Sequence, residues 1–176
     1  MSNSPPNSSG ATERASATIL PLPARAPERL VGVGFRCWFA GLSSGDIRCW
    51  EEAWNTFSGT LGPDNAKGLL IDLSKFVRAV KASANRDIEI SPSGCRGFCR
   101  DECLAISIVA ASQHGAHPAL TASAEALIGS DDIGDAINGA QSLAVSLRRA
   151  KQLLSPESIC PATCALRALT RRRITH

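Results

Sequence analysis

A stripe of apolar residues between residues 63 and 81 constrains the fold of this chain more than any other feature. Its members are adjacent in sequence or three to four positions apart: Leu69, Leu70, Leu73, Phe76, Val77 and Val80. Basic residues occupy positions that face away from this stripe: Lys67, Lys75, Arg78 and Lys81. Because an α-helix has 3.6 residues per turn, the pattern predicts an amphipathic helix that begins at Pro63 or Asp64 and buries one face.

Weaker patterns of the same kind predict further helices on both sides of this segment. A first helix is expected over residues 29–41, and Asp46 is expected to cap a second one with the apolar stripe Ile47, Trp50, Trp54 and Phe57. Later helices are expected over residues 98–115 and 119–128, and after two further start signals, Ser130 and either Ser155 or Cys160. Taken together, these expected helices predict an all-α fold, a compact array or bundle of six to seven helices. The alternating residues 87–91 allow one short extended segment before Pro92.

Composition divides the 176 residues into three parts. Residues 1–27 are rich in Ser, Pro, Asn and Ala and have no hydrophobic period, which predicts a disordered N-terminal tail. Residues 28–170 are predicted to form a single helical domain, since the apolar fraction of 44% and the charged fraction of 20% are typical of globular proteins. Residues 171–176 are a short basic C-terminal tail.

Charge is unevenly distributed along the chain. The net charge is +3, but residues 141–176 contain seven basic residues and one acidic residue, so this end carries +6 and the rest −3. Such an end is either a solvated segment that aids solubility or a contact for phosphate or for an acidic partner. Binding of nucleic acid is expected only through four arginines: Arg167, Arg171, Arg172 and Arg173.

The sequence also bears on the compartment. It shows no secretory leader, and its longest apolar run, residues 104–111, is too short to span a bilayer. We therefore expect a cytoplasmic protein without a membrane partner, whose thiols stay reduced. Seven cysteines in that compartment favour metal binding or redox chemistry over a framework of disulfides.

Five of the cysteines recur at a helical spacing: Cys95, Cys99, Cys103, Cys160 and Cys164. Thiolates four positions apart share one face of a helix and can bind the same metal ion. On one straight helix, however, Cys95 and Cys103 would lie about 12 Å apart along the axis, too far to bind one zinc ion. The glycines at positions 94 and 97 therefore predict that Cys95 lies on a loop that folds back over the start of a helix.

A fourth ligand must come from elsewhere in the chain. Cys164 or Cys160 is the first choice, and His114 or His117 is the second. The bound group would be zinc or an iron–sulfur cluster, since both are held by cysteine thiolates.

The same thiols have uses that need no metal. Cys99 and Cys160 are expected near helix N-termini, where the helix dipole would stabilise a thiolate and favour redox chemistry. In an oxidising compartment, disulfides from the segment 95–99 to the segment 160–164 could join two helices. Reduced cysteines also pack as small apolar residues, which is the expectation for Cys37 and Cys49.

Tryptophans and paired acids are the remaining candidates. Trp38, Trp50 and Trp54 could form a surface for a partner, but two of them continue an apolar stripe, so we expect them in the core. The pairs at positions 101–102 and 51–52, Asp-Glu and Glu-Glu, are expected on solvated helix faces. The sequence shows no apparent arrangement of nucleophile, base and acid, so enzymatic activity is not the favoured hypothesis.

Two hypotheses for the function follow. In the first, a small soluble helical protein binds zinc or an iron–sulfur cluster through its cysteine cluster and has a regulatory or assembly role. In the second, a helical module with structural cysteines binds a protein partner without a metal; a thiol redox or disulfide-linked protein is a further alternative.

Overall fold

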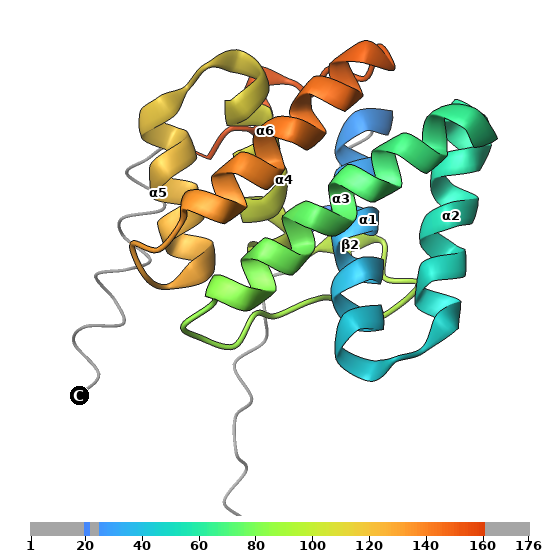
Figure 1. Cartoon of the computed structure of the whole chain (residues 1–176), viewed down its shortest axis with the longest axis horizontal. Coiled ribbons are helices and arrows are strands. Elements are labelled where there is room, and N and C mark those ends of the chain that lie inside the picture. Colours follow the sequence, from blue (N-terminus) through green and yellow to red (C-terminus); the bar gives the residue numbers. More distant parts are fainter. Residues whose placement is uncertain (1–19, 22–24, 161–176) are drawn as a thin grey trace, which may run out of the picture.

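Six α-helices make up most of the computed structural model of the chain, which describes residues 20, 21 and 25–160. In chain order the elements are β1 (Leu20–Pro21), α1 (Ala26–Ser44), α2 (Ile47–Leu61), α3 (Pro63–Ser83), β2 (Gly97–Phe98), α4 (Arg100–His114), α5 (His117–Ile128), α6 (Gly134–Arg149) and a 3₁₀ turn, η1 (Pro156–Ser158) (Figure 1). The predicted all-α array is confirmed. None of the helices within the described ranges combines the length and the apolarity needed to cross a bilayer.

Local sequence signals set most helix boundaries. Asp46 caps α2 as predicted, because its Oδ1 accepts a hydrogen bond from the Arg48 amide at 3.0 Å. Gly45 ends α1 in the left-handed conformation (φ 72°), where a residue with a Cβ would be strained. Pro63 begins α3 directly after Gly62, so α2 and α3 form a tight helical hairpin.

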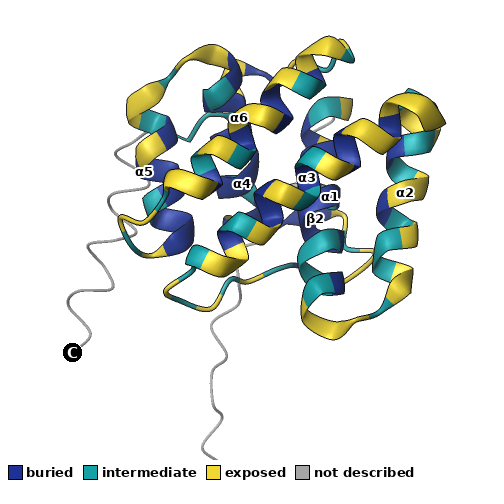
Figure 2. Cartoon of the chain, viewed as in Figure 1, coloured by how far each residue is buried: buried dark blue, intermediate teal, exposed yellow. Residues whose placement is uncertain are grey.

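The centre of the molecule is α4. Eight consecutive residues of this helix, 104–111, are buried, and the helix contacts α1, α5, α6 and η1 (Figure 2). A helix that is apolar on every side must be surrounded, so the long apolar run in the sequence is explained by this central position. The predicted buried face of α3 is also confirmed, since its six apolar residues all lie in the core.

The segment after α6 returns across the bundle and closes it. The Gln113 side chain accepts a hydrogen bond from the Leu154 amide at 2.8 Å and donates one to the Gln152 carbonyl at 3.0 Å. Glu28, in the first turn of α1, accepts from the Ser155 amide at 2.7 Å. The first and last parts of the described chain are thereby joined through buried polar groups.

Local details differ from the sequence patterns. Residues 87–91 carry no strand; the short strand of this region is β2, whose Phe98 pairs with Leu20 of β1. Ser130 does not cap α6, which begins at Gly134 without a side-chain cap, so its start is fixed by packing. Most of the predicted N-terminal tail, the predicted last helix beyond residue 160 and the basic tail 171–176 lie outside the described residues.

Helices α3 and α6 approach each other closely at Gly139. A Cβ atom at this position would lie 2.8 Å from Cα of Phe76, a backbone atom that cannot move without displacing α3. Gly68 on α3 offers a matched control, since a Cβ there would meet nothing within 4 Å.

We predict that Gly139→Ala lowers the free energy of unfolding by roughly 1–3 kcal/mol, because overpacking separates the two helices. Gly68→Ala should raise it by about 0.5–1 kcal/mol, since alanine is the better helix former. Urea unfolding followed by circular dichroism measures both; a Gly139→Ala variant as stable as Gly68→Ala would contradict the close approach.

Candidate functional site

A buried ion pair holds the cysteine segment in place. Arg36 of α1 donates two hydrogen bonds to Glu102 of α4, from Nε to Oε1 at 2.7 Å and from Nη2 to Oε2 at 3.0 Å. Arg36 is 4% exposed and Glu102 is fully buried. Such a bidentate ion pair is among the stronger polar interactions in proteins.

The remaining hydrogen bonds of this pair go to the segment between α3 and α4. Glu102 also accepts from the Ser91 amide, the Ser91 hydroxyl and the Cys99 amide, at 2.9, 2.8 and 2.8 Å. Arg36 donates to the carbonyls of Cys95 and Gly97 at 3.0 and 2.6 Å. The guanidinium also lies 5.3 Å from the centroid of a Phe98 ring.

These contacts determine the charge state of Glu102. Burial opposes ionisation, but the hydrogen bonds from Arg36, from the Cys99 and Ser91 amides and from the Ser91 hydroxyl outweigh it, so the pKa of Glu102 lies below its ordinary value. With its acceptor positions occupied, Glu102 has no spare capacity for a substrate. We conclude that the pair is a structural clamp on residues 91–99.

A second buried pair fixes the start of the same segment. Arg86 donates from Nη1 and Nη2 to Asp101 at 2.8 and 2.6 Å, and the Glu89 amide donates to Asp101 at 2.9 Å. The expectation that positions 101 and 102 lie on a solvated helix face was therefore wrong, because both side chains point inward to meet arginines distant in sequence. One sequence signal was missed: the spacing from Cys99 to Glu102 is that of a capping box, with Cys in place of Ser or Thr.

We predict that Glu102→Gln lowers the free energy of unfolding by about 3–5 kcal/mol, because it leaves the buried charge of Arg36 uncompensated. Asp46→Asn is the matched control: it removes an exposed pair with Arg48 but keeps a good helix cap, so stability should hardly change. Urea unfolding of both variants measures the difference, and similar losses in the two would contradict a buried clamp.

The clamp also predicts a pH dependence. Because the folded-state pKa of Glu102 is lowered, its contribution is complete above the ordinary value of 4.5 and is lost as the pH falls below it. Unfolding of the wild type should therefore become easier on acidification below about pH 4.5, with a shallower slope for Glu102→Gln. Equal slopes in urea titrations between pH 5 and pH 2.5 would contradict this assignment.

The cysteines of the cluster lie in different settings. Cys95 is half-buried on the loop, as predicted, and Cys99 is the N-terminal cap of α4, where its thiol donates to the Glu89 carbonyl at 3.1 Å. Cys103 lies one turn further along α4 and is half-buried. The Cys160 amide donates to the Ser107 hydroxyl at 2.8 Å, which brings the end of the described chain to α4.

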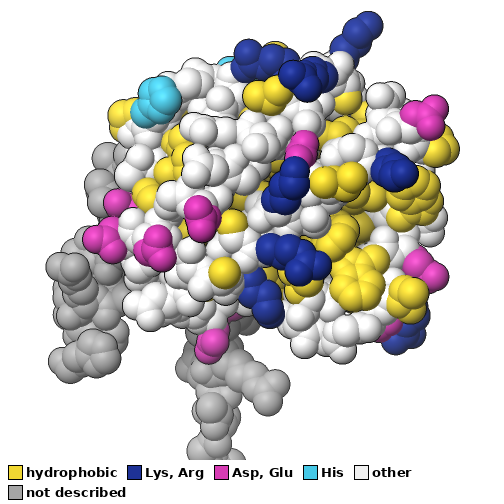
Figure 3. All heavy atoms as spheres, in the orientation of Figure 1, with side chains coloured by type: hydrophobic (Ala, Val, Ile, Leu, Met, Phe, Trp, Pro, Cys, Tyr) yellow, Lys and Arg dark blue, Asp and Glu magenta, His cyan; other side chains and the backbone are white. Residues whose placement is uncertain are grey.

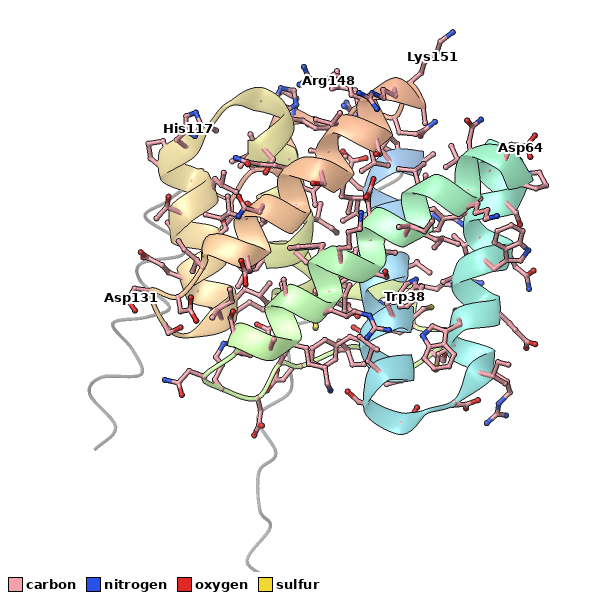
Figure 4. The ribbon with its side chains drawn as sticks, viewed as in Figure 1. Trp38, Asp64, His117, Asp131, Arg148 and Lys151 are labelled. Carbon is pink, nitrogen blue, oxygen red and sulfur yellow. The ribbon has the colours of Figure 1, made fainter. Side chains whose placement is uncertain are left out.

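No metal-binding group emerges from residues 25–160, where no three His, Cys, Asp or Glu side chains are placed to hold an ion. His114 bonds the Leu154 carbonyl at 2.8 Å through Nε2, and His117 is exposed at the start of α5 (Figure 4). No disulfide joins cysteines within that range. Since Cys164 lies outside the described residues, a zinc or iron–sulfur site that includes it stays a prediction.

Burial makes several thiols weak acids. It raises the pKa of Cys37 to about 12, with Glu52 and Cys49 adding to the effect, and the pKa of Cys103 to about 11, with Cys99 and Glu102 adding. Burial also raises the pKa of Cys99, against the expectation that the helix dipole would lower it. The core position expected for Cys37 is confirmed, whereas Cys49 is only half-buried.

We predict slow alkylation of Cys37 and Cys103, because the thiolate is the reacting species. At pH 8, iodoacetamide should modify each at least about tenfold more slowly in the folded protein than in the urea-unfolded chain. Peptide mapping by mass spectrometry measures the rates. Equal rates in the two states would contradict the burial described, and fast modification of Cys99 would favour the redox hypothesis.

An exposed apolar surface lies along the α2–α3 hairpin. Ile47 and Trp54 of α2 are 64% and 40% exposed, and Ile71 of α3 is 49% exposed. Together with Trp50 and Leu70 we call these residues the aromatic face. Figure 3 shows apolar side chains gathered over α2 and the neighbouring part of α3, beside Lys and Arg side chains.

Three residues of the aromatic face, Trp50, Trp54 and Leu70, line an open hollow of about 580 Å³ together with Glu51 and Asn55. The core position expected for Trp54 was therefore wrong. Helix α2 packs on its neighbours chiefly through Ala53 and Phe57, so the rest of its apolar stripe extends beyond the contact.

Trp50 forms the floor of this face and is held firmly. Its ring lies 6.2 Å from that of Trp38, which points from α1 toward α2 (Figure 4). A Cβ at Gly41 would lie 2.6 Å from Nε1 of Trp50, so only glycine permits this contact. Both Nε1 atoms are buried, and among the described residues neither has a hydrogen-bond partner, a cost that the packing of the two rings must offset.

Comparison of the chain with models of protein families, with curated proteins and with solved structures found no significant match.

Proposed function

We propose that the protein is a helical protein–protein interaction module that binds its partner through the aromatic face. The observation that carries this proposal is the exposure of Trp54 at an open hollow, on a hairpin that also exposes Ile47 and Ile71. Large exposed apolar groups gathered in one place mark interaction sites, and tryptophan supplies a large share of binding energy at interfaces.

The rest of the molecule supports this role as a rigid scaffold. The clamp of Arg36 and Glu102 and the Gly41–Trp50 contact fix α1 and α2 relative to each other and to α4. A surface whose shape is set in advance loses little conformational entropy when it binds.

We predict that Trp54→Ala weakens partner binding by about thirtyfold, the loss typical of an interface hot spot. The probes are helical peptides selected by display on the full-length chain. Val145→Ala on α6, another exposed apolar position, is the control and should bind the selected peptides normally. Selected peptides that bind both variants alike would contradict the proposal.

One further variant distinguishes our proposal from the competing metal hypothesis. Under our proposal, a Cys95→Ser, Cys99→Ser, Cys103→Ser protein keeps its fold and binds the selected peptides, because none of these residues lies on the aromatic face. A zinc or iron–sulfur protein would instead lose metal and much stability. Metal analysis of anaerobically purified protein, with urea unfolding of the variant, decides between the two.

A further inference from the structure

Resting on the proposed function, we infer that the partner presents an amphipathic α-helix with an acidic flank, which lies along the groove between α2 and α3. Helices α2 and α3 pack side by side, and the groove is the open hollow between them described above. Trp50 and Trp54 line the α2 wall and Leu70 the α3 wall. Docking of a helix into an apolar groove is a recurring mode of peptide recognition.

The charge of the partner follows from the α3 wall. Lys67 and Arg78 lie at helical spacing from Leu70 and Ile71, so they share the side of α3 that faces the groove. Both are exposed, and within the described residues neither forms an ion pair. They are therefore available to carboxylates of a partner.

The other two basic residues of α3 are already engaged. Lys75 bonds Asp72 at 3.1 Å, and Lys81 bonds the Ser43 hydroxyl at 2.7 Å while lying 5.0 Å from the Phe39 ring centroid. In the part of the chain that the structure describes, the basic groups of α3 without an ion pair or hydrogen bond are thus Lys67 and Arg78.

Spacing defines the partner helix further. Lys67 and Arg78 are eleven positions apart, which is about 16 Å along α3 at 1.5 Å per residue. A helix lying along the groove would therefore place two acidic residues about three turns apart on one flank. Glu51 on the α2 wall is exposed, so the opposite flank must be neutral or basic.

Charge also argues against two other occupants. Residues 161–176 contain four arginines and no acidic residue, so this segment would be repelled by Lys67 and Arg78. A second copy of the chain would bring the same two positive charges into the interface.

The test is a display selection on the full-length chain, with peptides that keep an apolar stripe at i, i+3, i+4 and i+7 and random residues on both flanks. We expect selected peptides that depend on Trp54 to carry Asp or Glu about eleven positions apart on one flank. A Lys67→Glu, Arg78→Glu variant should bind them about tenfold more weakly and should select Lys and Arg instead. Lys151→Glu, at an exposed position after α6 and outside the α2–α3 hairpin, is the matched control and should leave affinity unchanged.

The outcomes separate this inference from the proposed function. Trp54-dependent peptides with neutral or basic flanks would overturn the acidic helix and leave the interaction module standing. An absence of Trp54-dependent peptides would overturn both. Sedimentation velocity completes the test, since a dimer abolished by Trp54→Ala would assign the face to a second copy and overturn the inference.

Discussion

The contact between Arg36 and Glu102 joins the parts of the molecule that sequence keeps far apart. It links α1 to the first turn of α4, and its spare donors and acceptors bind the backbone of the loop between α3 and α4. Two opposite charges taken out of water are stable only when every donor and acceptor finds a partner, and here nearly all do so within one small region. The loop that carries Cys95 and ends at Cys99 therefore has its conformation set by a charge pair, and burial there raises the pKa of the Cys99 thiol.

Around this clamp the bundle divides into a closed part and an open part. Helix α4 is enclosed by α1, α5, α6 and η1, and it supplies the centre of the core. Among the described elements, helix α2 lies at the edge and contacts mainly α1 and α3, which leaves Ile47 and Trp54 of its apolar stripe exposed. The same hairpin that completes the core therefore supplies a hollow lined by two tryptophans of α2 and by Leu70 of α3, and the fixed core behind it gives that hollow a definite shape.

Much of the fold was predictable from local patterns, and the candidate site was not. The stripe from Leu69 to Val80 predicted α3 with its buried face, and Asp46 predicted the start of α2, because helix period and capping depend on neighbours in sequence. The stripe of α2 was also a correct indication of a helix, but it could not show that Trp54 is left 40% exposed. Asp101 and Glu102 were expected at the surface, because acidic residues in the first turn of a helix are usually exposed.

By itself the sequence determined the all-α class and the approximate positions of the six helices in residues 25–160, because helix period and end signals follow from residues within a few turns of one another. Tertiary structure alone decided which charges are buried and which apolar groups are left exposed. Glu102 is buried because Arg36 lies sixty-six positions earlier in the chain and reaches it across the bundle. Trp54 is exposed because α2 packs on α1 and α3 chiefly through Ala53 and Phe57. Burial depends on what lies opposite a side chain, and that is a property of the assembled fold rather than of any local segment.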